Sequence, residues 1–165
     1  LAHSDNTLAD QYCRFAARAA GAPATYEGAT STVASTLSAA GVPTEGLFLE
    51  DCSGLSSNDR ISANTLVGVL KASYSGQGTS ADTMRLLPWA GLVGTLSKRM
   101  TEEPAVGNVQ AKTGALAEVS SLSGSVITRG GRVLLVSIGH DRVTAGALAT
   151  RGRLDAFEEG LAGLN

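Results

Sequence analysis

The sequence predicts an α+β fold in which helices flank an antiparallel sheet. Residues 119–126 and 132–138 are two β-branched and aliphatic runs, and the glycine-containing segment 129–132 between them indicates a tight turn. Apolar residues recur at helical spacing before residue 75 and again near the C-terminus. Hydrophobic residues make up 43% of the 165 residues, which is enough for a core.

The first half of the chain is predicted to be mainly helical. A helix over 4–20 places Leu8, Tyr12, Phe15 and Ala19 on one face and stops at Gly21. A second helix over 28–40 ends at Gly41, and residues 46–49 form a brief strand. A third helix over 62–73 has Ser62 as its N-cap, and the glycine-rich segment 76–80 breaks it.

The second half predicts the sheet and the helix that covers it. Short helical turns are expected over 81–86 and 95–100, and strands over 106–113, 118–128 and 132–140. A final helix over 144–161 is expected to pack on one sheet face through Leu148, Leu154, Phe157 and Leu161. With no repeat or linker, the chain predicts one domain.

Composition excludes several classes of function. The net charge is −2, only 17% of residues are charged, and no basic cluster indicates nucleic-acid binding. No apolar run is long enough for a membrane span. The two cysteines are far apart in sequence and there are two histidines, so we expect neither a metal site nor a cofactor.

Lys112, Thr113 and Gly114 are expected on or beside the strand that precedes the predicted hairpin. A cation and a hydroxyl there suit an anionic ligand, and a glycine lets the ligand's backbone approach closely. The alternative is an exposed strand end that runs into a turn. The Ser4-Asp5-Asn6 motif lies 108 residues before Lys112. Ser4 also suits a helix N-cap, and that structural role does not exclude a role in a site with Lys112.

A third stretch makes a resemblance specific. Residues 49–62, with Asp51-Cys52-Ser53-Gly54-Leu55-Ser56, resemble the Asp-x-Ser-Gly-Leu-Ser segment of the class C low-molecular-weight penicillin-binding proteins. These are D-alanyl-D-alanine carboxypeptidases and endopeptidases of the peptidase S13 type. Residues 87–96 and 112–124 also look like that family. The resemblance covers the chain from Ser4 to about Leu161 and corresponds to the C-terminal part of the family's catalytic domain.

The resemblance implies a serine D,D-peptidase of the β-lactamase/DD-peptidase-like fold that acts on D-Ala-D-Ala stem peptides of peptidoglycan and binds penicillin. The family's nucleophile is the serine of a Ser-x-x-Lys motif, and residues 1–165 contain no such motif. In the family that motif lies upstream of Ser-Asp-Asn. We therefore expect 1–165 to be the C-terminal portion of one catalytic domain, whose N-terminal portion is its partner.

The resemblance also implies roles for individual residues. The resemblance implies that Ser4 relays the proton to the leaving nitrogen and that Lys112 keeps the cleft positive. Asn6 would bind the substrate amide. Thr113, in the Lys112-Thr113-Gly114 motif, would bind the terminal carboxylate. The N–H of Ala115 would be an oxyanion-hole donor. Relatives often have threonine at the position of Ala115, so a second hydroxyl for the carboxylate is missing here.

The two cysteines bear on the cellular location of the protein. The resemblance implies an exported protein, where Cys13 and Cys52 would form a disulfide, although two separately buried thiols remain open. An extracytoplasmic location, in the periplasm or cell envelope, follows from the same resemblance. The alternative functions are a non-catalytic peptidoglycan- or partner-binding module of the same fold, and a β-lactamase or esterase.

Overall fold

The computed structural model describes residues 1–76 and 81–165. They form two compact units, one of residues 1–4 and 70–165 and the other of residues 5–69. The first is called the sheet unit below, and the second the helical unit. The glycine-rich segment 76–80, which was predicted to end the third helix, lies outside the described residues except for Gly76. Gly76 has a positive φ of 70°. Within the described residues, no helix is long and apolar enough to cross a membrane.

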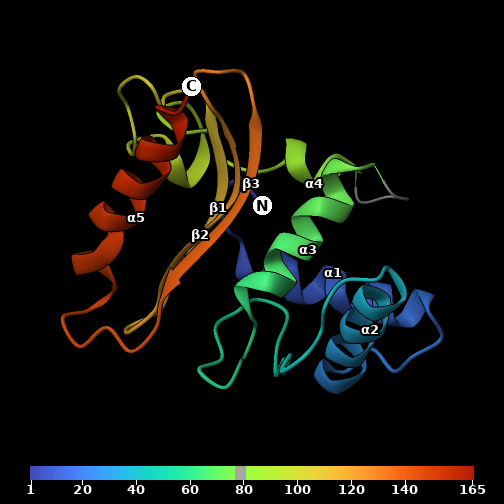
Figure 1. Cartoon of the computed structure of the whole chain (residues 1–165). Coiled ribbons are helices and arrows are strands. Elements are labelled where there is room, and N and C mark those ends of the chain that lie inside the picture. The colour runs from blue at the N-terminus through green and yellow to red at the C-terminus, as the bar shows by residue number, and fades with distance from the viewer. Residues whose placement is uncertain (77–80) are drawn as a thin grey trace. The chain divides into compact units, whose positions relative to one another are not determined.

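The sheet unit confirms the predicted α+β class. Its strands are β1 (Val109–Ala115), β2 (Ser120–Ile127) and β3 (Val133–His140), in the order β1-β2-β3 (Figure 1). Both pairings are antiparallel. The tight turn between β2 and β3 is present, with Gly131 N donating to Thr128 O at 2.8 Å. The strands begin one to three residues later than predicted.

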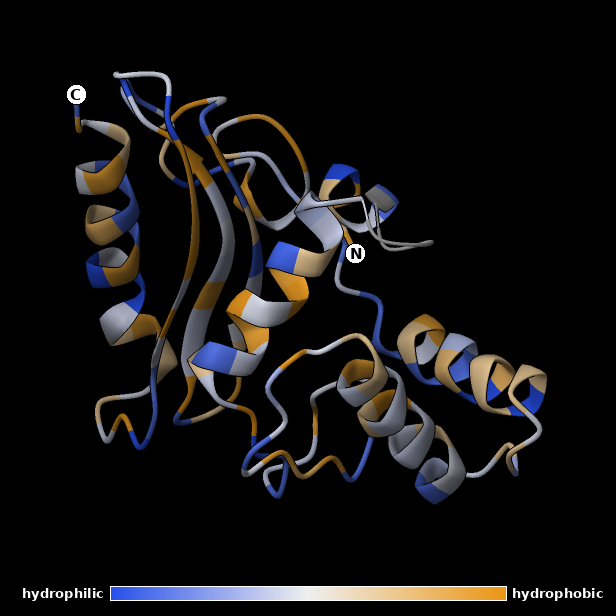
Figure 2. Ribbon diagram, turned by 45° about the vertical axis from the view of Figure 1, so that its right-hand side comes forward, coloured by the Kyte–Doolittle hydropathy of each residue, from blue (hydrophilic) through white to orange (hydrophobic). Residues whose placement is uncertain are grey.

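One sheet face is covered by α5 (Ala147–Ala162) (Figure 1). The core on this face is fully buried and contains the residues Ala90, Leu96, Val109, Ala111, Leu122, Val126 and Leu154. Hydrophobic residues recur along the strands (orange in Figure 2). On β3, Leu135 packs instead with Leu70 in the second half of α3 (Ala63–Tyr74) and with Met84 and Leu87 in and just after α4 (Ala81–Arg85). Adjacent residues of a strand point to opposite faces, so Leu134 and Leu135 serve two different clusters.

The face that α5 turns inward differs from the prediction. Leu154 is fully buried and Leu161 packs against the core, but Leu148 and Phe157 are 73% and 46% exposed. The buried residues of α5 are Thr150, Leu154, Glu158 and Ala162, which recur every four residues. The helix is therefore rotated from the orientation that its large apolar residues predict, and it carries a glutamate into the core.

The helical unit contains α1 (Asn6–Ala19) and α2 (Tyr26–Ala39), which pack against each other, and the start of α3. The N-cap of α1 is Asp5, whose carboxylate accepts from Leu8 N at 2.9 Å, so the capping role considered for Ser4 is wrong. Ser62 does cap α3, because its hydroxyl accepts from Thr65 N at 3.0 Å. The strand predicted over 46–49 is reduced to one bridge between Phe48 and Arg60.

A disulfide joins Cys13 on α1 to Cys52, across 39 residues of sequence. It ties the first helix to the segment 50–56, as the sequence led us to expect. The apolar stripe predicted for α1 is not buried, since Leu8, Tyr12 and Phe15 are 52%, 68% and 61% exposed. Spacing identified a common face correctly, but nothing in the described residues covers it.

Candidate functional site

Ser4 and Lys112 meet in the sheet unit. Lys112, in the middle of β1, donates from Nζ to the hydroxyl oxygen of Ser4 at 2.7 Å and to the carbonyl oxygen of Thr113 at 2.6 Å. The two residues are 108 positions apart, and both are half-buried. The contact places a hydroxyl against a cationic amine, which is an arrangement that can accept and pass on a proton.

The backbone around Ser4 is held in an unusual conformation. Ser4 has a φ of 54°, in the left-handed region that few non-glycine residues adopt. Its N–H donates to Leu1 O at 3.1 Å, and the carbonyl oxygen of Ala2 accepts from Thr95 N at 3.1 Å. Such a conformation persists where surrounding contacts enforce it. Here those contacts turn the Ser4 side chain toward β1.

Thr95 lies in the short 3-10 helix η2 (Gly94–Leu96). Thr113 donates from its hydroxyl to the hydroxyl of Thr95 at 3.0 Å, so η2 is linked to both the Ser4 segment and β1. The sequence placed Thr95 in the family-like stretch 87–96 and at the start of a predicted helical turn, and indicated no functional role for it. The Gly94-Thr95-Leu96 sequence beside the Lys-Thr-Gly motif becomes informative only once the two are seen in contact.

Lys112 and Thr113 leave β1 on different sides. Paired residues of neighbouring strands point to the same face of the sheet. Thr113 is paired with Leu122, which lies in the core on the α5 face, so Thr113 points to that face. Lys112 is paired with Ser123 and points to the opposite face. Side chains alternate along a strand, so the ammonium group and the hydroxyl can serve one ligand only where the ligand lies along the free edge of β1.

Among the described residues, backbone hydrogen bonds to other segments are found at the beginning of that edge. Ala111 N donates to Pro88 O, and Ala90 N donates to Val109 O, both at 2.9 Å. Backbone groups of alternate residues point to the same side of a strand, so the N–H groups of Thr113 and Ala115 also point outward along this edge. Ala115 is exposed at the end of β1.

Packing inside the sheet is one constraint on Gly114. A Cβ at this position would lie 2.3 Å from Ser121 Oγ on β2. This constraint adds to the close approach of a ligand backbone, which stays a prediction. Gly124 is more constrained, since its Cβ would lie 2.0 Å from Gln110 O. Both glycines keep β1 and β2 closely packed beneath the site.

Burial lowers the pKa of Lys112 below its ordinary value of 10.5. The charged form loses hydration in a half-buried position, and the acceptors Ser4 Oγ and Thr113 O replace part of it. A lysine of lowered pKa can exchange a proton with a neighbouring hydroxyl more readily than an exposed one.

Asn6 is the first residue of α1 and belongs to the helical unit. It follows the Asp5 cap, so its place at a helix start is fixed locally. The Ser4-Asp5-Asn6 motif thus contributes Ser4 to the sheet unit and Asn6 to the helical unit. The structure brings together Ser4, Lys112 and Thr113 within the sheet unit, whereas Asn6 belongs to the helical unit.

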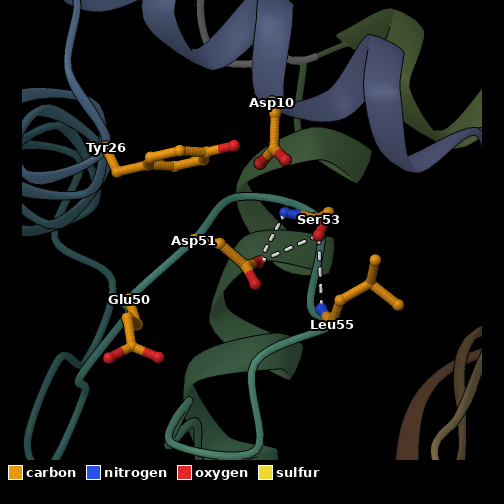
Figure 3. A pocket seen from close by; sticks show the side chains of 6 residues that line it. All are labelled: Asp10, Tyr26, Glu50, Asp51, Ser53 and Leu55. Atoms are coloured by element: carbon orange, nitrogen blue, oxygen red, sulfur yellow. Dashed lines mark hydrogen bonds between the residues drawn. The ribbon is translucent and has the colours of Figure 1, made fainter.

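The Asp51 segment of the helical unit is a loop built around one carboxylate. Asp51 accepts from Ser53 N at 2.8 Å, Gly54 N at 2.6 Å and Ser56 N at 2.7 Å. Figure 3 shows this carboxylate turned toward Ser53. Burial acts to raise the pKa of Asp51, but these donors outweigh it and hold the pKa below its ordinary value. The family-like segment is thereby fixed in shape.

A shallow pocket of about 320 Å³ adjoins this loop (Figure 3), lined by Asp10, Tyr26, Glu50, Asp51, Ser53 and Leu55. Its carboxylates are engaged by the protein itself. Asp10 accepts from Cys52 N at 3.1 Å, and Glu50 accepts from Asn58 Nδ2 at 3.2 Å and from the Ser56 hydroxyl. No group of three or more potential metal ligands is present in residues 1–76 and 81–165. The acidic side chains therefore shape the loop.

Comparison with known proteins identifies the family. The model of the D-Ala-D-Ala carboxypeptidase 3 (S13) family matches residues 1–161. The chain belongs to this family. It is 39% identical over 140 residues to the carboxypeptidase DacB of Mycolicibacterium smegmatis, covering 82% of this chain and 30% of that protein. It is 36% identical over 129 residues to the D-alanyl-D-alanine carboxypeptidase of Actinomadura sp., covering 74% of this chain and 24% of that protein.

The fold agrees with this assignment. Penicillin-binding protein 4 of Haemophilus influenzae matches with a TM-score of 0.85 and 31% identity, over 97% of this chain and 36% of that one. The resemblance to S13 peptidases and the predicted fold class are thus confirmed. The chain spans about a third or less of the length of these relatives.

Proposed function

We propose that the chain is the C-terminal portion of the catalytic domain of a serine D,D-peptidase that cleaves D-Ala-D-Ala stem peptides of peptidoglycan and is acylated by penicillin. The observation that carries the proposal is the 2.7 Å hydrogen bond from Lys112 Nζ to Ser4 Oγ, in a chain of the S13 family. The nucleophilic serine belongs to an N-terminal portion of the same protein, which is the partner of residues 1–165.

The nucleophile's hydroxyl oxygen attacks the carbonyl carbon of the penultimate D-Ala and gives up its proton to the lysine of the same Ser-x-x-Lys motif, which thereby becomes an ammonium group. The new C–O bond forms an acyl-enzyme as the C–N bond to the terminal D-Ala breaks. Ser4 delivers a proton to the leaving nitrogen, because its hydroxyl can accept a proton from one ammonium group while donating its own. Water then hydrolyses the acyl-enzyme. Lys112, beside Ser4, keeps the site positive and supports this relay.

The substrate lies along the open edge of β1. The outward N–H of Ala115 stabilises the oxyanion of the tetrahedral intermediate. Thr113 binds the terminal carboxylate, and Asn6 binds the substrate amide. Gly114 keeps β1 close to β2. A residue set that combines a positive cleft with hydroxyl donors suits an anionic peptide terminus.

Two features favour a longer protein as the working unit. The stripe of Leu8, Tyr12 and Phe15 on α1 is more than half exposed, and the relatives are about three times as long as the matched region. Burial of such a stripe in a partner surface would remove apolar area from water. An extracytoplasmic location fits the Cys13–Cys52 disulfide, because disulfides persist in oxidising compartments.

The test is a denaturing intact-mass measurement of the complete protein before and after incubation with benzylpenicillin. We expect one penicilloyl adduct, located by proteolysis outside residues 1–165, and slow deacylation. Rapid release of penicilloate would indicate a β-lactamase instead. The absence of any adduct would contradict the proposed acyl-transfer function and favour a non-catalytic binding module.

A further inference from the structure

Thr95 makes the side-chain contact to Thr113 that the proposed function leaves unused. Thr113 Oγ1 donates to Thr95 Oγ1 at 3.0 Å, and both side chains are partly buried. A hydroxyl has one proton and two acceptor positions. While Thr113 gives its proton to Thr95, that proton is not available to an anionic ligand, so the state of Thr95 decides what Thr113 can offer.

The position of Thr95 is fixed by contacts on both sides. Its N–H donates to Ala2 O at 3.1 Å, and the next residue, Leu96, is fully buried in the core. Gly94 has a φ of 68°, and a Cβ there would lie 2.4 Å from Ala2 O. The close approach of η2 to the segment that carries Ser4 therefore requires a glycine. This anchoring holds the Thr95 hydroxyl at Thr113.

Thr113 of the hydroxyl pair lies close in sequence to Ala115, which has only a methyl group at the exposed end of β1. Thr113 and Thr95 together bring two hydroxyl groups within hydrogen-bond distance of each other. When an anion approaches, Thr113 can turn its proton toward the anion and accept one from Thr95, so that no hydroxyl oxygen loses a partner.

We propose that Thr95 is a positioning residue that acts through Thr113 and sets the preference of the site for ligands with a free carboxylate. This inference rests on the proposed function, because it assigns the carboxylate to Thr113. It adds that the preference depends on a hydroxyl outside the Lys112-Thr113-Gly114 motif, supplied by η2.

The experiment measures acylation of the complete protein by benzylpenicillin and by its methyl ester, which lacks the free carboxylate. Thr95→Val removes the hydroxyl and keeps the side-chain shape, and Thr95→Ser is the matched variant that keeps the hydroxyl. We expect Thr95→Val to slow acylation by the free acid about tenfold, as expected for loss of a hydrogen bond that supports a charged group. Acylation by the ester should change less than about twofold, and Thr95→Ser should behave like the parent.

A double-mutant cycle tests whether Thr95 acts through Thr113. In a Thr113→Val background, Thr95→Val should change acylation by the free acid less than about twofold. Equal losses with the acid and the ester in Thr95→Val, or a full additional loss in the double variant, would overturn the inference while leaving the acyl-transfer function intact. If the parent protein is acylated by neither compound, the proposed function and this inference both fail.

Discussion

Lys112 Nζ lies 2.7 Å from Ser4 Oγ although 108 residues separate them in sequence. The contact is possible because Lys112 occupies the edge strand β1 while η2 holds the Ser4 segment through the bond from Thr95 N to Ala2 O. The Ser4 segment and β1 therefore meet at this amine, and η2 holds the Ser4 segment in place.

Replacing Lys112 by methionine should lower acylation of the complete protein by benzylpenicillin about 100- to 1,000-fold, the loss typical of removing one stabilising donor from an active site. Stability at pH 7 should be unchanged or higher, because a half-buried charge of lowered pKa is replaced by an apolar chain. Acylation rates and thermal unfolding check the two parts. Lys98→Met, at an exposed position, is the control and should change neither. A Lys112→Met variant that retains acylation would exclude the proposed role.

Glu158 predicts a pH dependence of stability. It is 1% exposed, neither carboxylate oxygen has a hydrogen-bond partner among the described residues, and its neighbours include Asp155 and Arg99. Burial, with a smaller effect of Asp155, raises the pKa of Glu158 from 4.5 to about 7. Between these values the folded state binds more protons than the unfolded state. The free energy of unfolding should therefore fall, by about 3 kcal/mol, as pH rises from about 4.5 to 7, and then level off.

Denaturant unfolding of the complete protein at several pH values measures this effect. Glu158→Gln should remove this part of the dependence and should be more stable than the parent above pH 7, because a neutral amide replaces a buried charge. Glu102→Gln, at an exposed position, should keep the parent's dependence. Identical pH profiles for the parent and Glu158→Gln would show that Glu158 is not the titrating group.

Removing the Cys13–Cys52 disulfide should cost about 4 kcal/mol, the loop-closure entropy expected for a separation of 39 residues. The double variant Cys13→Ser, Cys52→Ser, unfolded in urea beside the parent, measures the cost. A reducing agent should destabilise the parent by a similar amount and leave the double variant unchanged. Parent stability that does not respond to reduction would contradict a stabilising disulfide.

Residues 1–165 on their own should self-associate. Within the described residues β3 pairs only with β2, and α1 exposes Leu8, Tyr12 and Phe15. An open strand edge and an apolar helix face both promote association. Light scattering of the isolated chain should show oligomers that the N-terminal portion suppresses, and Tyr12→Ser with Phe15→Ser should reduce them. A monomer with a cooperative unfolding transition would argue against the need for a complement.

Local sequence was sufficient for much of this fold. Alternating and β-branched runs predicted β1, β2 and β3 to within a few residues, because strand propensity and turn glycines act over short distances. Helical spacing predicted α1, α2, α3 and α5 for the same reason. The motifs Ser4-Asp5-Asn6 and Lys112-Thr113-Gly114, with the Asp51 segment, were enough to indicate the S13 family.

The tertiary structure alone decided which side chains meet. Periodicity shows that Leu8, Tyr12 and Phe15 share a face of α1, but burial of that face depends on a covering surface, and in the described residues they are exposed. Periodicity likewise could not show that α5 buries Glu158 and exposes Leu148. Packing against the sheet sets how the helix is turned about its own axis. The contact of Thr95 with Thr113 and that of Ser4 with Lys112 arise only when distant segments are brought together by the core, which no local pattern encodes.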